Sequence, residues 1–367
     1  LAGVELTRIH LEEDTARSQH VGDRSLVDYN RAGVPLMELV TEPVIHDAAT
    51  AGRFAKELQL LLRYLGAGHA NMEKGEMRVE ANISISKTGE LGTKVEVKNL
   101  NSFRSVERAI AFEVARQAKL LDAGGAVVQE TRGWDEAKQV TFSQRKKESS
   151  HDYRYFPDPD LPKLVLSEIP EFTIDTLKQE ISGKLPWDKR ASYIALGLSE
   201  ESAELFVTNV GLGQFFDLVT AEIGKDKELV KLATNYISSD LVSLIKTATD
   251  VEEAEISIHP TYFTDLMKMI KEGMVSSRGA KDILAEMYTN GGEPAVIAKE
   301  KGLEQQSDIG ALTAIAQKVI DANAVVAADF KAGKEAAMQF LVGQGMKESK
   351  GSANPAALRT TFIELLK

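Results

Sequence analysis

The sequence predicts an α+β domain at its N-terminal end, followed by two all-α regions. The first 165 or so residues mix strand and helix patterns, whereas only helical patterns follow from about residue 170. The proline-rich stretch Phe156–Pro162 (FPDPDLP) separates the two kinds of sequence. A chain of 367 residues is also too long for one ordinary core. We therefore expect an α+β domain over residues 1–168, a helical domain over residues 169–293 and a small helical tail domain over residues 294–367.

The strand prediction rests on apolar residues that alternate with polar ones. Between Met77 and Ser86 every second residue is apolar, which is typical of a strand with one face in a core. The shorter run Thr93–Lys98 alternates valines with charged residues in the same way. The connections are too irregular for repeated βαβ units, so we expect largely antiparallel strands.

Two helices are predicted in the same domain from their capping residues. Asp47 and Ser102 are residue types that accept hydrogen bonds from the first turn of a helix. Each precedes a segment with apolar residues at helical spacing, and Gly66 and Gly124 follow those segments as natural ends.

The rest of the chain is predicted to be helical. In the helical domain the clearest patterns are Phe206–Ile223, Leu229–Ile245 and Tyr262–Lys271. In the tail domain three helices are expected over Ile309–Asn323, Ala324–Gln344 and Pro355–Leu366. The paired glycines and the proline of Asn290–Pro294 interrupt the helical patterns between these two groups.

The composition restricts the function. The formal net charge of −11 argues against a general nucleic-acid binder, but it allows a tRNA partner that meets local basic patches. The absence of cysteine excludes disulfides, cysteine-ligated metals and a thiol nucleophile. No apolar run approaches the roughly 18 residues that a transmembrane helix needs, so no membrane partner is expected.

Two carboxylates are candidate ligands for a hard cation. Glu38 lies within the apolar run Leu36–Val40, where a carboxylate is costly unless it is paired or bound to a metal. Glu80 lies on the polar side of the strand predicted over Met77–Ser86. Simpler interpretations stay open: Glu38 in an ion pair with an arginine such as Arg31, and Glu80 on the wet side of a sheet. If the carboxylates act together, Mg²⁺ is the expected cation, because it takes a few carboxylates with water and phosphate oxygens.

Motifs of other chemistries are missing from the sequence. There is no glycine-rich phosphate loop, no HExxH and no GxSxG, so a nucleotide would bind on another kind of scaffold. Among the six histidines, His10 is of interest because it stands beside Glu12 and Glu13, although a single histidine is more often structural.

Several ordered motifs carry a family resemblance. They are LVDYNRAGVPLMELVTEP (Leu26–Pro43), MRVEANIS, KVEVKNLNSF, QETRGWDE (Gln129–Glu136), DYRYFPDPDLP (Asp152–Pro162) and GKEAAMQFLVGQGMKESKGSANP (Gly333–Pro355). Together they closely resemble the GatB family, the B subunits of bacterial-type glutamyl/aspartyl-tRNA amidotransferases, whose C-terminal segment is shared with the small helical YqeY domain. The related archaeal-type E subunit usually carries an inserted synthetase-like domain, and no such insertion is visible between residues 170 and 290. The family normally also has an upstream segment with part of its active site, so we expect this chain to be truncated at its N-terminus.

The resemblance implies an architecture and a reaction. It implies a cradle domain related to glutamine synthetase, then the helical domain and the YqeY-like tail. ATP would phosphorylate the side-chain carboxylate of Glu or Asp carried by tRNA(Gln) or tRNA(Asn), and ammonia would displace the phosphate. It further implies Mg²⁺, ATP as co-substrate, an amidase A subunit and a small C subunit in a heterotrimer, and a location in the bacterial cytoplasm.

The family's metal-binding catalytic carboxylates match Glu13, Glu38 and Glu80 of this sequence. At Glu80 a family member has Asp, one methylene shorter. Strict alternation through Ile9–Thr15 would instead place Glu12 on the polar side of its strand, so Glu12 is the alternative ligand.

Further candidates are basic or amide side chains. Contacts with phosphate or with the tRNA acceptor end are expected from Lys94, Lys98, Asn99 and Asn101, for which strand-edge charge and an Asn-rich turn are the simpler interpretation. Contacts with tRNA phosphates are expected from Lys334, Lys347 and Lys350, which alternate with glycines, whereas a solvated helix face is the simpler interpretation.

Two other functions remain as alternatives. A non-catalytic tRNA-binding adaptor is the first, and it leaves the clustered carboxylates without a role. A stand-alone ammonia ligase of the glutamine synthetase type is the second, and it leaves the long helical tail without one. An amidation assay with misacylated tRNA separates the three.

Overall fold

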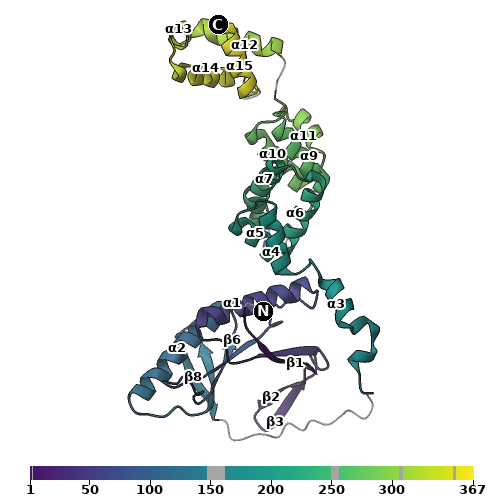
Figure 1. The fold of residues 1–367 in the computed structure, drawn as a ribbon, viewed down its shortest axis with the longest axis vertical. Coiled ribbons are helices and arrows are strands. Elements are labelled where there is room, and N and C mark those ends of the chain that lie inside the picture. Colours follow the sequence, from purple (N-terminus) through teal and green to yellow (C-terminus); the bar gives the residue numbers. More distant parts are fainter. Residues whose placement is uncertain (2, 147–161, 249–255, 306–308, 350–352) are drawn as a thin grey trace. The chain divides into compact units, whose positions relative to one another are not determined.

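The structure, a computed structural model, describes the chain except for residues 2, 147–161, 249–255, 306–308 and 350–352 (Figure 1). It divides into two compact units, Leu1–Pro186 and Trp187–Lys367. All the strands of the described residues lie in the first unit. The described part of the second unit is helical apart from isolated bridge residues, such as the pair Val275 and Glu304. The predicted α+β class is therefore confirmed. The expected domain boundaries at residues 168 and 293 stay predictions.

Small, largely antiparallel sheets build the first unit. One two-stranded ladder joins β1 (Leu6–Glu13) to β4 (Pro35–Thr41), and a hairpin joins β2 (Arg17–Val21) to β3 (Arg24–Asp28). A four-stranded sheet has the order β5 (Val79–Ile83), β6 (Val95–Leu100), β7 (Glu130–Asp135) and β8 (Val140–Lys146). Among these described pairs β6–β7 is the parallel one. β5 is shorter than the predicted strand because its last residue, Ile83, already pairs with the first residue of β6.

The two predicted helices of this unit are confirmed, with their caps. In α1 (Ala48–Tyr64) the side chain of Asp47 accepts a hydrogen bond from the Thr50 backbone N–H at 2.7 Å. In α2 (Phe103–Asp122) the Ser102 hydroxyl accepts one from the Ser105 backbone N–H at 3.0 Å. Gly66 and Gly124 follow with φ of +66° and +77°, the left-handed conformation that glycine adopts without strain.

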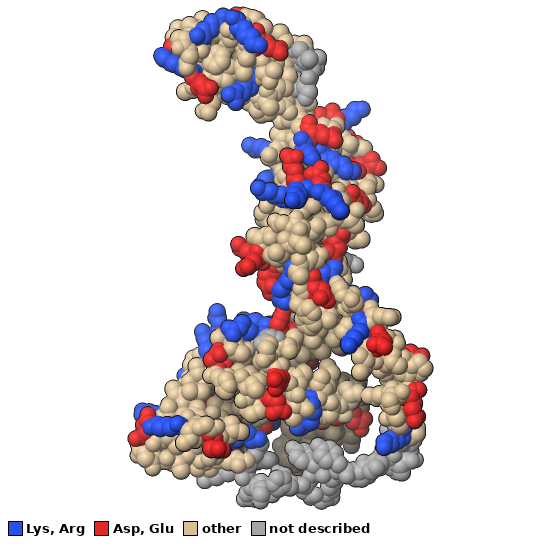
Figure 2. Space-filling view, in the orientation of Figure 1, with Lys and Arg blue, Asp and Glu red and all other residues tan. Residues whose placement is uncertain are grey.

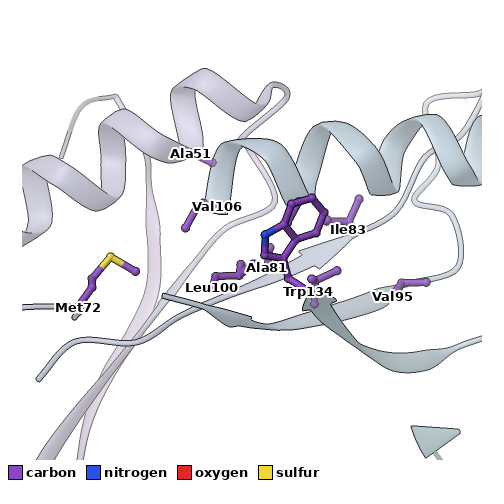
Figure 3. Packing of buried hydrophobic residues seen from close by; sticks show 10 residues of the cluster. Ala51, Met72, Ala81, Ile83, Val95, Leu100, Val106 and Trp134 are labelled. Carbon is purple, nitrogen blue, oxygen red and sulfur yellow. The ribbon is translucent and has the colours of Figure 1, made fainter. Parts of the chain in front are cut away.

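The helices and the four-stranded sheet enclose a core (Figure 3). Val95 and Val97 of β6 are 0% exposed and belong to the same cluster as Val106 of α2 and Trp134 of β7. Burial of a valine side chain stabilises the fold by about 1.5–3 kcal/mol. Glu96, between the two valines, points to the other face, as the alternation predicted. The sheet thus has one face toward the helices and one polar face.

A buried polar network connects α2 with β7 and β8. The Glu113 side chain is 0% exposed and accepts hydrogen bonds from Arg116 Nη2 at 2.6 Å, Gln117 Nε2 at 2.9 Å and Thr141 Oγ1 at 2.9 Å. Arg132 Nε lies 3.6 Å from the same carboxylate. Burial by itself would raise the pKa of Glu113, but these hydrogen bonds outweigh it and hold the pKa below its usual value. The network therefore contains an ionised carboxylate between two arginines.

The helices that follow, up to the tail, are short. The first unit ends with α3 (Ile174–Ile181), and the next helices are α4 (Pro186–Ala195), α5 (Glu200–Thr208), α6 (Val210–Ile223), α7 (Lys227–Asn235), α8 (Val242–Ala248), α9 (Pro260–Lys271), α10 (Ser277–Asn290) and α11 (Pro294–Glu300). A π-helical segment, η3 (Tyr236–Leu241), joins α7 to α8. α11 packs against α9 and α10, with Ala298 fully buried.

The single helix predicted over Phe206–Ile223 is wrong, because the chain bends at Asn209 between α5 and α6. The reason is a close helix crossing. A Cβ at Gly213 would lie 2.4 Å from the Phe206 carbonyl oxygen, so α6 folds back directly onto α5. The rings of Phe206 and Phe216 stack across this crossing, with centroids 4.4 Å apart.

The tail contains four described helices, α12 (Ile309–Ala322), α13 (Ala324–Lys331), α14 (Glu335–Glu348) and α15 (Pro355–Leu366). The single helix predicted over Ala324–Gln344 is therefore wrong. Gly333, at φ +93°, separates α13 from α14, a conformation that a helix interior does not contain. The tail has its own core around Leu312, Leu341 and Phe362, each 0% exposed.

No single described helix is long and apolar enough to cross a membrane. The segments Gly310–Ala322 and Ala324–Lys331 reach that length only as a pair, and the pair is bent by 99°.

Candidate functional site

The β1–β4 ladder gathers a histidine and two carboxylates. His10 lies directly opposite Glu38, and Glu12, two residues along β1, is on the same face. His10 Nε2 is 3.5 Å from Glu38 Oε2, with the two side chains 34% and 50% exposed. One ligand atom from each of His10, Glu12 and Glu38 lies within 4.8 Å of the others. We call these three residues the ladder cluster.

The structure brings Glu12, and not Glu13, to Glu38. Glu13 pairs with Pro35 and, as the neighbour of Glu12 in a strand, points to the opposite face. The predicted alternation therefore holds as far as Glu13, where β1 ends, and it places Glu12, the alternative ligand, on the face of Glu38. The role of Glu13 as a ligand stays a prediction.

Glu38 is not the buried carboxylate that its apolar neighbours indicated. Half of its side chain is exposed, so the expected burial cost does not apply. The pairing of Glu38 with Arg31 is also not found, because Arg31 Nε lies 3.0 Å from Asp14 Oδ2 instead. The residue of the sequence that pointed most directly to this site is His10, whose position opposite Glu38 follows only from the pairing of β1 with β4.

Glu80 and Lys98 meet at a β-bulge. Val79 pairs with Leu100 and Ala81 with Val97, so that Glu80 alone opposes both Lys98 and Asn99. Lys98 Nζ lies 3.0 Å from each of the two carboxylate oxygens of Glu80. Bulges of this kind turn side chains out of the regular pleat and are frequent beside active sites.

A second carboxylate, which the sequence did not single out, completes this group. Glu96 Oε1 is 3.6 Å from Lys98 Nζ, and Thr131 Oγ1 of β7 donates a hydrogen bond to Glu96 Oε2 at 2.8 Å. Partial burial lowers the pKa of Lys98, but Glu80 and Glu96 outweigh it, and the net pKa is raised. Lys98 is therefore an ammonium ion at neutral pH. We call Glu80, Glu96, Lys98 and Thr131 the sheet cluster.

The remaining candidates of this domain lie close by in sequence. Asn99 is exposed and lies within β6 rather than in a turn, while Lys94 and Asn101 are exposed just before and just after the strand. Among the described residues, the ladder cluster is the group whose ligand atoms could hold one ion, and Glu80 is not part of it. The motif Asp152–Pro162 lies outside the described residues except for Pro162.

The three tail lysines have different surroundings. Lys334 Nζ is 2.9 Å from Asp329 Oδ1, Lys347 is exposed in the last turn of α14, and Lys350 lies outside the described residues. Gly345 has a packing role, because a Cβ there would lie 2.4 Å from Leu358 Cδ2. On the face that Figure 2 shows, basic and acidic side chains are interspersed over the helical second unit. Contacts of these lysines with tRNA stay a prediction.

The bulge makes a prediction about stability. Asn99 has φ +65°, a conformation that glycine and asparagine tolerate and β-branched residues do not. We expect Asn99→Val to lower the free energy of unfolding by about 1–2 kcal/mol and Asn99→Gly to change it by less than about 1 kcal/mol. Urea unfolding followed by circular dichroism measures both. Equal stability of the two variants would show that the bulge does not depend on this conformation.

Comparison with known proteins agrees with the motifs. A family model described as GatB/GatE catalytic domain matches residues 2–170, and one described as GatB domain matches residues 214–366. Three similar proteins are named as the B subunit of an aspartyl/glutamyl-tRNA(Asn/Gln) amidotransferase. The chain is 45% identical to that of Herpetosiphon aurantiacus over 96% of its own length and 73% of the relative. It is 40% identical to those of Carboxydothermus hydrogenoformans and Brevibacillus brevis, over 98% of its own length and 75% of each relative.

The two matched regions follow the division seen in the structure. The catalytic-domain match covers the strands and the two clusters, and the other match lies within the helical second unit. The identity extends over nearly the whole chain rather than one motif. The chain therefore belongs to the family of aspartyl/glutamyl-tRNA(Asn/Gln) amidotransferase B subunits, which are parts of an amide-forming ligase.

Proposed function

We propose that this chain activates a tRNA-bound carboxylate with ATP and amidates it with ammonia from a partner subunit. The substrates are Glu-tRNA(Gln), Asp-tRNA(Asn) or both. The proposal is supported by the membership of the chain in the B-subunit family and by the ladder and sheet clusters, which both lie in the α+β unit. The ladder cluster offers ligands for a cation, and the sheet cluster offers an ammonium ion for phosphate.

The donor set of the ladder cluster fits Mg²⁺. This cation prefers one or two carboxylates together with water and phosphate oxygens, and Glu12 and Glu38 provide two exposed carboxylates on one face. His10, beside Glu38, would orient that carboxylate or act as a third ligand. When bound, Mg²⁺ supplies positive charge that gathers phosphate oxygens and neutralises charge in the transfer.

The reaction proceeds in two displacements. An oxygen of the tRNA-bound carboxylate attacks the γ-phosphorus of ATP, the bond from that phosphorus to ADP breaks, and an acyl phosphate forms. Ammonia then attacks the carbonyl carbon, the bond to phosphate breaks, and the nitrogen loses a proton to give the amide. We assign Lys98 to the phosphoryl oxygens, with Lys94, Asn99 and Asn101 as neighbouring contacts for phosphate or the acceptor end.

The partners follow from the same proposal. Ammonia would come from an amidase A subunit, with a small C subunit completing a cytoplasmic heterotrimer of the bacterial type. Lys334, Lys347 and Lys350 would meet tRNA phosphates, which position the ligand without reading its bases.

The proposal is tested by an amidation assay. The enzyme that contains this chain, assembled with its A and C subunits, is given ATP, Mg²⁺, glutamine and either Glu-tRNA(Gln) or Asp-tRNA(Asn). We expect at least one of the two tRNAs to acquire the amide, with one ATP hydrolysed to ADP per amide formed. Binding of both tRNAs without amidation of either would overturn the proposal in favour of a non-catalytic adaptor.

A further inference from the structure

The ion pair between Glu80 and Lys98 occupies both groups at once. The ammonium of Lys98 lies 3.0 Å from each carboxylate oxygen of Glu80. No oxygen of Glu80 is thus free of a cationic neighbour, and the positive charge of Lys98 is already neutralised. The pair is also accessible, with side chains 38% and 41% exposed. A ligand from solvent can therefore reach either partner.

We propose that Glu80 and Lys98 form an exchange pair: each blocks the other until a divalent cation takes Glu80 and a phosphate oxygen takes Lys98. This inference rests on the proposed function, because it concerns the ATP of that reaction and a divalent cation at Glu80, in addition to the one proposed for the ladder cluster. The new element is that binding of the cation and binding of the phosphate are coupled, because both require Glu80 and Lys98 to separate. When no nucleotide is bound, Lys98 competes with the cation for Glu80.

The energetics permit such an exchange. An ion pair with this exposure is held weakly, because solvent screens both charges, so a divalent cation and a phosphate can displace it. Lysine also suits the exchange, since its ammonium is a compact charge on a flexible stem, whereas arginine would hold a carboxylate through two fixed bonds. The bulge faces Glu80 with both Lys98 and Asn99, so the backbone orients the pair independently of the charges.

Glu96 keeps Lys98 in place when Glu80 is taken. Its carboxylate lies 3.6 Å from Lys98 Nζ and is fixed from the other side by the hydroxyl of Thr131 at 2.8 Å. With a side chain 14% exposed, Glu96 is less accessible to an ion from solvent than Glu80. Lys98 can therefore turn from Glu80 to a phosphate while it remains beside Glu96. Glu96 and Thr131 are positioning residues in this arrangement.

The exchange predicts that removal of one partner strengthens binding to the other. Without nucleotide, Lys98→Met is expected to bind Mn²⁺, the probe for the cation, about fivefold more tightly than the wild type. With EDTA present, Glu80→Gln is expected to bind metal-free ATP about fivefold more tightly. Both are measured by calorimetric titration of the assembled enzyme. A merely structural ion pair would leave these affinities unchanged or weaken them.

A matched pair on the same unit provides the control. Lys87 Nζ and Asp122 Oδ1 are 2.7 Å apart and well exposed, and Lys87→Met and Asp122→Asn should leave both affinities unchanged. Lys98→Arg keeps the competing charge and holds the carboxylate through two bonds, so its Mn²⁺ affinity should not exceed that of the wild type, which separates competition from misfolding. An unchanged or weaker Mn²⁺ affinity in folded Lys98→Met, or an unchanged ATP affinity in Glu80→Gln, would overturn the exchange. The proposed function fails separately, by absent amidation in the wild-type enzyme.

Discussion

Glu38→Gln is expected to lower the rate of ATP-dependent carboxylate activation by at least about 100-fold, which corresponds to about 3 kcal/mol of transition-state stabilisation. The substitution keeps the shape of the side chain but removes the charge that would hold Mg²⁺ beside His10 and Glu12. Binding of tRNA should stay within a few-fold of the wild type, because Glu38 lies beside His10 and Glu12 and not on a basic surface. Phosphate release from ATP in the presence of Glu-tRNA, together with a tRNA-binding titration, measures the two effects.

Three further variants sharpen this result. Glu12→Gln should be impaired comparably if the ladder cluster is the cation site, whereas Glu13→Gln should be impaired instead if the family correspondence holds against the strand geometry. Glu5→Gln, an exposed carboxylate just before β1, is the control and should activate normally. A folded Glu38→Gln enzyme with a normal rate would remove the cation role from the ladder cluster.

Glu113→Ala is expected to lower the free energy of unfolding of the first unit by about 3–5 kcal/mol. The carboxylate is fully buried and is shared by Arg116 and Arg132. Its removal takes from Arg116 its hydrogen-bonded counter-ion and leaves Arg132 with Glu130 alone. Urea unfolding followed by tryptophan fluorescence suits the measurement, since Trp134 lies in the core of the same unit. Glu107→Gln is the control on the same helix. Its carboxylate is 38% exposed and 3.8 Å from Lys56 Nζ, and a change below about 0.5 kcal/mol is expected.

The network also makes the stability depend on pH. Burial would raise the pKa of Glu130, but hydrogen bonds from Ser143 and Arg132 lower it, so Glu113 and Glu130 both have a lowered pKa in the folded state. Their contribution is fully present above the unfolded pKa of about 4.3 and is lost as the pH falls through the lower folded values. The wild type should therefore lose stability below about pH 4, and Glu113→Gln should lose less over the same range. A parallel decrease in both proteins would contradict the assignment to Glu113.

Local features of the fold followed from the sequence. Asp47 and Ser102 cap the helices predicted for them, and Val95 and Val97 face the core as their alternation indicated. These features depend on residues within one turn or one strand, where spacing and side-chain chemistry decide the conformation. The same alternation offered Glu12 as the residue on the polar face of β1. The family correspondence pointed to Glu13 instead, but in the structure Glu12 is the residue that shares a face with His10 and Glu38.

The breaks in the helices depended on tertiary packing. The bend at Asn209 follows from the close contact of Gly213 with Phe206 across the crossing of α5 and α6, which no spacing within either helix reveals. Gly333 could be identified in the sequence as a possible helix end. A glycine within a helical pattern ends the helix only when the next helix packs in another direction.

The sequence by itself determined the fold class, the family and most of the polar residues from which the site is drawn, with Glu96 and Thr131 as the exceptions. Only the tertiary structure decided which of them meet. His10 and Glu38 come together because β1 pairs with β4 in one register, and Glu80 meets Lys98 because β6 has one residue more than β5 between two paired positions. Pairing register is set by contacts between segments far apart in the chain, and a shift of one residue turns every side chain to the other face. For that reason the chemistry of the two clusters could be named from the sequence, but their membership could not.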